Sequence, residues 1–290
     1  MTNDKAMFCF GLGYTARALA ASLPFEDWVI SGTSRGDGSR DRPKSDGART
    51  YVFDRDRPLP WPTQTLAGVT HLLVSVPPDA EGDPVLDCHG TDIGSMQSLS
   101  WIGYLSTVGV YGDRRGGWVD ETSECRPRTE RSIRRAAAER VWLDLSRRKN
   151  VPVHVFRLAG IYGPGRNPVE SARRGTARRI LKPGQVFSRI HVSDIVQVLR
   201  ASMERPDPGA IYNVCDDEPA PPQDVVAFAC DLAGCEVPPL VSFDEAELTE
   251  IERSFYAECR QVRNDRIKKD LGVTLRYPNY RAGLSALAAG

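Results

Sequence analysis

Residues 7–20 read MFCFGLGYTARALA, and this stretch decides the fold. Residues 7–10 predict a short buried strand, and residues 16–23 predict a helix. Between them lies a tight turn with the spacing G-x-G-x-x-A. A strand, a glycine turn and a helix in this order are typical of a dinucleotide-binding unit.

Each small residue of this turn has a physical role. Gly11 permits a turn that a Cβ would obstruct, Gly13 lets the backbone approach a pyrophosphate, and Ala16 lets the helix pack closely on the strand. The start of the helix offers free N–H groups and a positive dipole end to phosphate. The alternative is a tight strand-to-helix turn that holds no ligand. The expected cofactor-binding residues are Gly11, Gly13, Tyr14, Thr15 and Ala16.

Composition excludes several classes of partner. Lys+Arg and Asp+Glu balance at 38 each, so the protein has no net charge whose electrostatic field would attract nucleic acid or a membrane surface. Seven cysteines are scattered without a C-x-x-C pair, and no zinc spacing or disulfide framework is visible. With no signal peptide and no long apolar run, we expect a cytoplasmic protein without a bound metal.

Strands and helices are predicted to alternate along the chain. Further strands are expected at residues 28–33, 50–54, 69–76, 101–106, 153–159 and 210–214. Helices are expected at 84–99, 127–149, 195–203 and 222–233, with a polar loop at 35–50 and a mostly helical tail at 243–287. This alternation predicts an α/β protein with a doubly wound parallel sheet. We expect a dinucleotide-binding core over residues 1–166. Residues 167–290 supply the remaining core strands and a small C-terminal substrate lobe, as one compact unit.

The end of the second strand bears on the choice of cofactor. An acidic residue there would accept hydrogen bonds from the ribose 2′-hydroxyl of NAD, but the strand ends Thr33-Ser34-Arg35. A hydroxyl and a guanidinium suit a 2′-phosphate, which Arg pairs in a bidentate way. We therefore favour NADP(H) over NAD(H), with Ser34 and Arg35 as the selecting residues. An ordinary polar loop is the alternative.

The carboxyl ends of parallel strands are where ligands bind in such sheets. Asp54 closes the third strand, where its carboxylate would meet the adenine amino group or cap a turn. Ser75, Val76 and Pro77 follow the fourth strand and are expected to lie along the cofactor.

Five stretches along the chain form a recognisable series. They are GLGYTA (11–16), LSTVGVYG (105–112), FRLAGIYGPGR (156–166), RIHVSDI (189–195) and IYNVCDDE (211–218). Through them the chain resembles the extended short-chain dehydrogenase/reductases, the group that includes NAD-dependent sugar epimerases and dehydratases. The resemblance covers almost the whole chain and implies a Rossmann core of about seven parallel strands with a C-terminal substrate lobe. It also implies a small-molecule substrate and a homodimer formed through the helix at 127–149.

The resemblance also implies where the chemistry lies. Members of this family use a Ser or Thr after strand five, a Tyr that moves the proton, and a Lys four residues later that lowers the Tyr pKa and holds the ribose. Thr107 occupies the first position. When Glu139 is matched to a Glu common after the Lys, the other two positions fall at Arg131 and Arg135. The helix at 127–149 contains no Tyr-x-x-x-Lys.

This departure limits the expected chemistry. Arg has a reference pKa of about 12.5 or above and is no base near neutral pH. Arg135 would bind the ribose as the Lys does, and Arg131 would hold an anion. The alternative is a solvated helix face on which Arg135 pairs with Glu139. An apolar stripe along the same helix is predicted at Ile133, Ala137, Val141 and Leu145.

Other residues of the matching stretches are less specific candidates for the site. Tyr111 would supply a phenol near the site, although packing is the more frequent role, and Tyr162 is expected to line the cofactor pocket. Arg166 and Arg189 would bind a phosphate or carboxylate of the substrate or remain surface charges. His191 is expected to make a structural hydrogen bond, and Asp194 to cap the helix that follows it.

Two function classes remain open. The first is an NADP(H)-dependent oxidoreductase or epimerase-like enzyme with a rearranged site and an anionic substrate. The second is a non-catalytic NADP(H)-binding protein that senses redox state or regulates a partner. Thr107 and the substrate lobe favour the first class, whereas Arg131 and Arg135 favour the second.

Overall fold

The computed structural model of this protein describes residues 5–36 and 49–289. Most of the polar loop expected at residues 35–50 lies outside the described residues. The chain forms two compact units that alternate along the sequence. The sheet unit comprises residues 1–107, 133–157 and 196–212, and the second unit comprises residues 108–132, 158–195 and 213–290.

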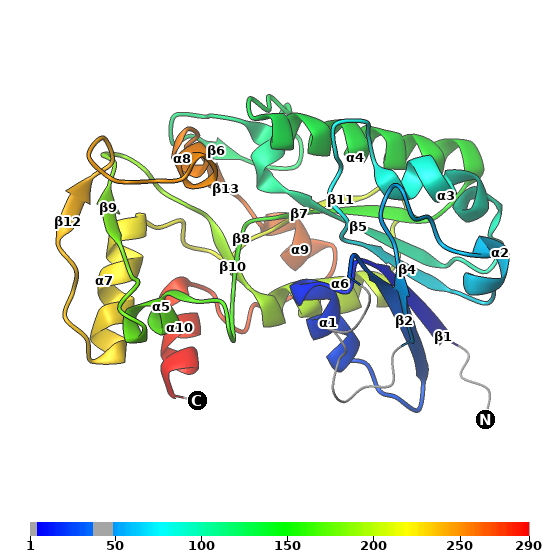
Figure 1. The fold of residues 1–290 in the computed structure, drawn as a ribbon, viewed down its shortest axis with the longest axis horizontal. Coiled ribbons are helices and arrows are strands. Elements are labelled where there is room, and N and C mark those ends of the chain that lie inside the picture. The colour runs from blue at the N-terminus through cyan, green and yellow to red at the C-terminus, as the bar shows by residue number, and fades with distance from the viewer. Residues whose placement is uncertain (1–4, 37–48, 290) are drawn as a thin grey trace. The chain divides into compact units, whose positions relative to one another are not determined.

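The sheet unit is built on a seven-stranded sheet with the order β11-β7-β5-β4-β1-β2-β3 (Figure 1). Strand β1 pairs in parallel with β2 and β4, and the pairs β2–β3 and β4–β5 are also parallel. Every one of the seven expected strands is present, each within two residues of its expected bounds. The α/β fold with a doubly wound parallel sheet is therefore confirmed. The strands are β1 (Lys5–Phe10), β2 (Trp28–Ser34), β3 (Arg49–Val52), β4 (His71–Val74), β5 (Trp101–Thr107), β7 (Val153–Leu158) and β11 (Ile211–Val214).

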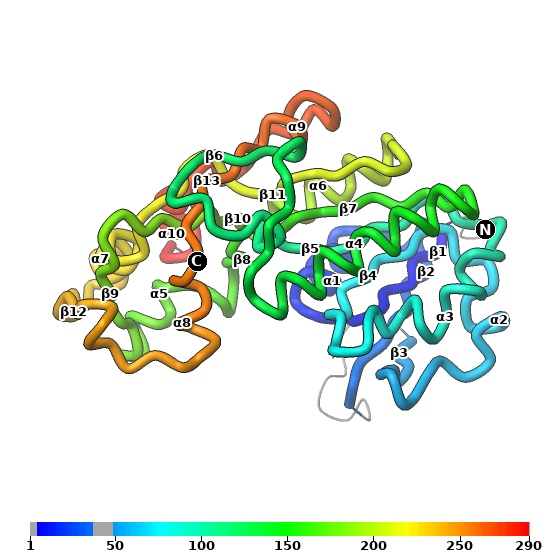
Figure 2. The backbone as a smooth tube through the Cα atoms, turned by 90° about the horizontal axis from the view of Figure 1, so that it is seen from above, coloured from blue at the N-terminus to red at the C-terminus, as the bar shows by residue number. Residues whose placement is uncertain are grey.

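Helices cover both faces of this sheet. On one face α3 (Pro84–Ser95) and α4 (Glu130–Lys149) lie side by side (Figures 1 and 2). The indole of Trp142 on α4 donates 3.1 Å to Asp83, the residue that caps α3. On the other face α1 (Tyr14–Ala21) lies beside α6 (Val192–Glu204), and Arg200 of α6 donates 3.1 Å to the carbonyl of Ser22 at the end of α1. The short helix α2 (Pro62–Thr65) follows β3 and contacts α3. Alternate side chains of β5 reach the two layers, because Trp101 bonds to Ser202 of α6 while Tyr104 packs on Trp142.

The prediction that an apolar stripe runs along α4 at steps of four residues is wrong. Ile133 and Val141 are each 47% exposed, whereas Glu139 and Trp142 are buried. A step of four residues advances the helix face by about 40°, so a stripe of strict fourth residues winds around the helix rather than facing one layer. The face that meets the sheet carries Ala138, Trp142 and Leu145 together with the carboxylate of Glu139, so only Leu145 of the predicted stripe is buried in this core.

The second unit has its own core and several short paired strands. Strand β8 (Gly160–Tyr162) pairs with β10 (Arg189–His191), β9 (Arg179–Leu181) with β12 (Leu240–Ser242), and β6 (Trp118–Val119) with β13 (Gln261–Val262). The core includes Tyr162, Val225 and Tyr280. The helices are η1 (Val108–Tyr111), α5 (Pro168–Arg173), α7 (Pro222–Ala233), α8 (Glu250–Tyr256), α9 (Asp265–Lys269) and α10 (Tyr280–Ala289).

The tail is less helical than its sequence predicts. Residues 243–287 contain α8, α9 and most of α10, but also the strand β13. That strand exists because Gln261 and Val262 pair with β6, which is more than a hundred residues earlier in the chain. Among the described residues no helix is long and apolar enough to cross a membrane. No group of metal-binding side chains is found there either.

Candidate functional site

The glycine turn between β1 and α1 is fixed by the ends of two neighbouring strands. Gly11 has φ +91°, and a Cβ there would lie 2.6 Å from the Ser75 hydroxyl. The N–H of Gly11 donates 2.9 Å to the Thr33 hydroxyl at the end of β2. The Ser75 hydroxyl, after β4, donates 2.7 Å to the carbonyl of Gly11. Only glycine fits at position 11, because both the backbone angle and the space exclude a side chain.

The turn leaves room for a phosphate at its second glycine. A Cβ built on Gly13 meets no protein atom within 4 Å. Gly13 also stands at the N-cap of α1, where no side chain accepts the helix N–H groups and no acidic residue lies in the first turn. Tyr14 and Thr15 begin the helix, and Ala16 is fully buried against the core. This open, uncapped helix start fits the pyrophosphate of a dinucleotide.

The segment after β4 lies where the sequence places it. Ser75 and Val76 are half-buried and Pro77 is exposed at the carboxyl end of the strand. The Ser75 side chain fastens the glycine turn through its bond to Gly11. It therefore fixes the backbone conformation of the glycine turn.

The end of β2 carries the two residues expected to select the cofactor. Ser34 is half-buried and its hydroxyl lies 3.4 Å from the carbonyl of Gly36, whereas Arg35 is exposed. Asp54, expected to meet the adenine or to cap a turn, caps a turn: its carboxylate accepts hydrogen bonds from the backbone N–H and the guanidinium of Arg57. Arg57 belongs to none of the motifs by which the sequence indicates a cofactor site.

Arg135 reaches the carboxyl-terminal half of β5. Its Nη1 donates 3.1 Å to the Tyr104 hydroxyl and 2.9 Å to the carbonyl of Leu105, two residues before the half-buried Thr107. No described residue accepts a hydrogen bond from its Nε or Nη2. Burial raises the pKa of Tyr104, so this phenol stays protonated.

Glu139 does not pair with Arg135, so the expected alternative of a solvated Arg135–Glu139 pair is wrong. Its carboxylate is buried and accepts hydrogen bonds from Arg157 of β7, at 2.8 Å from Nη2, and from Ser106 of β5. These bonds tie α4 to two strands of the sheet. Position 139 therefore faces the sheet.

In the second unit, Arg131 is exposed on the first turn of α4. Its guanidinium lies over the ring of Phe255 on α8, 4.6 Å from the ring centroid. No described residue accepts a hydrogen bond from this guanidinium. Tyr111 is fully buried, and its phenol donates 2.7 Å to the side chain of Asn213.

Tyr162 is a core residue of the second unit. Its side chain is 5% exposed, and its ring centroid lies 5.2 Å from that of His191. A Cβ on Gly283 of α10 would come within 2.1 Å of its hydroxyl, so this glycine permits the packing. Burial raises the pKa of Tyr162 and lowers that of His191 to about 4. His191 accepts a hydrogen bond from the N–H of Ser193, in accord with a structural role.

The remaining candidates have diverse surroundings. Arg189 donates from Nη1 to the carbonyls of Phe187 and Ala220, and burial lowers its pKa. Arg166 is exposed in a turn closed on Gly163. Asp194 lies within α6 and does not cap it as expected, because its carboxylate accepts hydrogen bonds from the backbone N–H groups of Arg276 and Tyr277.

Several known proteins resemble this chain in sequence or in fold. A sequence profile of the NAD dependent epimerase/dehydratase family matches residues 99–215. A functionally unknown conserved protein from Silicibacter pomeroyi is 53% identical, with 98% of both chains covered and a TM-score of 0.90. Protein YeeZ from Escherichia coli K12 is 26% identical over 95% of this chain and 97% of its own length. UDP-glucose 4-epimerase from Thermotoga maritima shares the fold, with TM-score 0.80, 15% identity, and 98% and 97% of the two chains covered.

The parallel sheet, the uncapped helix start and the glycine turn together define a dinucleotide-binding α/β protein. The chain belongs to the NAD-dependent epimerase/dehydratase family of the short-chain dehydrogenase/reductase superfamily. Members of this family bind NAD(P), and the open space at Gly13 fits such a cofactor.

Proposed function

We propose that this protein is an NADP(H)-binding oxidoreductase of the epimerase/dehydratase type that handles a small anionic substrate without a Tyr–Lys proton relay. The observation that carries the proposal is the placement of Arg135 on α4, with Nη1 bonded to β5 and its other nitrogens unbonded among the described residues. Helix α4 contains no tyrosine and no lysine before its last residue. A nicotinamide cofactor accepts or supplies the hydride when bound.

Arg135 takes the part of the family lysine in this proposal. Its guanidinium is anchored at one end by Tyr104 and the carbonyl of Leu105, so the remaining N–H groups are held in a fixed direction. A fixed cationic donor suits the ribose hydroxyls of the cofactor. Thr107, which follows on the same strand, would bond the substrate oxygen.

Arg131 takes the part of an anion-binding residue. The Phe255 ring supports one face of its guanidinium, whose N–H groups donate to no described residue. A guanidinium edge binds a carboxylate or phosphate through two bonds, or stabilises a developing oxyanion. It does not move a proton near neutral pH. Since the Tyr111 phenol donates to Asn213, we assign the proton to water.

The alternative is a non-catalytic NADP(H)-binding protein that senses redox state or regulates a partner. It rests on the same two arginines, because neither supplies a proton. Thr107 and the second unit favour the enzyme. We further propose a homodimer through α4, supported by the exposed Ile133 and Val141. We also propose a reducing compartment, the cytoplasm, supported by seven cysteines that form no disulfide in the structure.

Replacing Arg35 with alanine is expected to weaken NADPH binding by about tenfold or more, the equivalent of one lost charge-assisted hydrogen bond. Binding of NADH should be nearly unchanged, because NADH has no 2′-phosphate. Calorimetric titration with both cofactors measures this. Equal losses for the two cofactors, or tighter binding of NADH by the unmutated protein, would overturn the NADP(H) preference.

The combined change Arg131→Tyr with Arg135→Lys restores the family pair. We expect the unmutated protein to be inactive toward ordinary ketones with NADPH, and the double variant to reduce them weakly, because a tyrosine with a neighbouring lysine supplies the proton. The rate and its pH profile are measured with Arg140→Tyr, an exposed position of the same helix, as the control. If the unmutated protein reduces ketones and the double change leaves the rate and pH profile alone, neither position lies at the site.

A further inference from the structure

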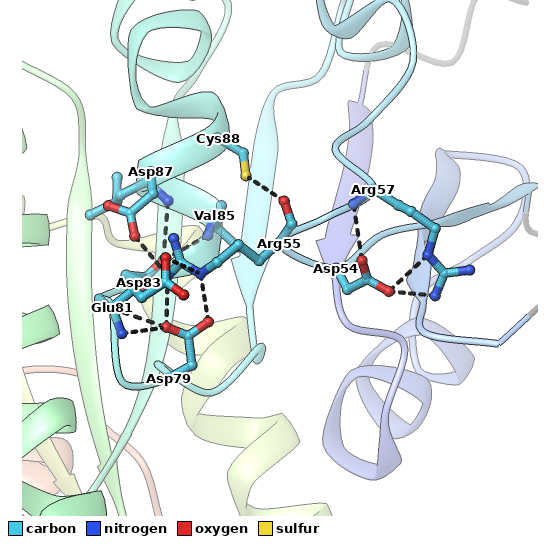
Figure 3. Close-up of polar contacts among 11 residues, drawn as sticks. Asp54, Arg55, Arg57, Asp79, Glu81, Asp83, Val85, Asp87 and Cys88 are labelled. Carbon is cyan, nitrogen blue, oxygen red and sulfur yellow. Dashed lines mark hydrogen bonds and ion pairs between the residues drawn. The ribbon is translucent and has the colours of Figure 1, made fainter.

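The chain makes a tight turn after β3 that presents two arginines in different directions. The N–H groups of Asp54 and Arg57 each donate 3.2 Å to the carbonyl of the other residue. Figure 3 shows the result, with the side chain of Arg55 directed toward α3 and that of Arg57 directed away from it. The reciprocal backbone bonds fix both side chains to one closed loop.

Arg55 anchors the turn to the segment that follows β4. Its Nε and Nη2 donate 2.7 and 2.8 Å to the two carboxylate oxygens of Asp79, and Nη2 lies 2.8 Å from Asp87 of α3 (Figure 3). These carboxylates raise the pKa of Arg55, which is only 21% exposed in its side chain. The turn is thus held in place independently of Arg57.

Arg57 is held against the end of β2. Its Nε donates 2.9 Å to Asp54 Oδ2, and its backbone N–H donates 3.0 Å to Oδ1. Its Nη2 contacts the same carboxylate and donates 2.9 Å to the backbone carbonyl of Arg35. No described residue accepts a hydrogen bond from its Nη1. A pre-oriented guanidinium whose Nη1 bonds to no described residue therefore stands beside Arg35, the residue that follows β2.

We propose that Arg57 is a second residue that recognises the cofactor 2′-phosphate, with Asp54 as the positioning residue that orients it. This inference rests on the proposed NADP(H) binding. A phosphate monoester carries close to two negative charges and three acceptor oxygens, which suit two guanidinium groups approaching from neighbouring segments. Asp54 then serves the cofactor through Arg57 rather than through the adenine.

The experiment isolates the 2′-phosphate by comparing adenosine 2′,5′-bisphosphate with adenosine 5′-monophosphate in calorimetric titrations of the full chain. We expect the unmutated protein to bind the bisphosphate more tightly, and Arg57→Gln to reduce this preference by about tenfold. Binding of the monophosphate should be unchanged. Arg57→Lys should keep part of the preference, since it retains the charge and loses the planar fork.

The matched control is Arg147→Gln, since Arg147 is also an exposed arginine paired with an aspartate three residues away, Asp144. It should change neither affinity. If Arg35→Ala reduces the preference and Arg57→Gln does not, the role of Arg57 is refuted while NADP(H) binding stands. If Arg57→Gln weakens both ligands equally, Arg57 only supports the turn and the inference is also refuted. If the unmutated protein does not prefer the bisphosphate, the NADP(H) proposal itself fails.

Discussion

Replacing Gly13 with valine is expected to leave the protein folded and to reduce its affinity for NADPH and NADH alike by about a hundredfold or more. A Cβ at this position meets no protein atom within 4 Å, so the added methyl groups extend from an open position. They occupy the space in front of the α1 N-terminus, where the pyrophosphate would accept hydrogen bonds from the helix N–H groups. Loss of two charge-assisted hydrogen bonds accounts for a reduction of about this size.

The measurement pairs calorimetric titration with thermal unfolding of each variant. Gly11→Ala is the informative contrast, because its Cβ would lie 2.6 Å from Ser75 Oγ at φ +91°. That variant should lose stability together with binding, whereas Gly13→Val should lose binding alone. Gly90→Ala, on helix α3 with ordinary space for a Cβ, should affect neither. Unchanged cofactor affinity of Gly13→Val would place the phosphates elsewhere.

Removing either partner of the buried Glu139–Arg157 pair is expected to lower the free energy of unfolding by about 3–5 kcal/mol, because it leaves one buried charge without its counterion. The two side chains are only 4% and 5% exposed. Arg157 approaches both carboxylate oxygens, at 3.2 Å from Nε and 2.8 Å from Nη2. Ser106 donates a further hydrogen bond to the same carboxylate.

Urea denaturation of Glu139→Gln, Arg157→Met and the double variant Glu139→Met with Arg157→Met tests this expectation. The double variant should lose much less than the sum of two single losses, since no unpaired charge remains. The exposed pair Arg147–Asp144 supplies the control, and Arg147→Gln should cost no more than about 1 kcal/mol. A loss as small as this in the single variants at 139 and 157 would contradict the burial of the pair.

Some site assignments could not have been made from sequence spacing alone. The Arg135–Glu139 spacing suggested a pair on the helix surface, but Glu139 instead meets Arg157, eighteen residues further along the chain. Helical periodicity identifies which residues share a face, but not which neighbour that face meets. Here the neighbour is a strand that offers Arg157, so the charged side chain of Glu139 is buried on the same face as Ala138, Trp142 and Leu145.

The sequence by itself determined the order of strands and helices and the shape of the glycine turn. Apolar runs, turn residues and the requirement for glycine at φ +91° are local properties, so they can be recognised in a short stretch of sequence. Only the tertiary structure decided that Arg57 reaches the carbonyl of Arg35 and that Tyr111 bonds to Asn213. These contacts join residues 22 and 102 positions apart. They depend on which segments the fold makes neighbours, because a side chain's partner is set by spatial proximity and not by its place in the sequence.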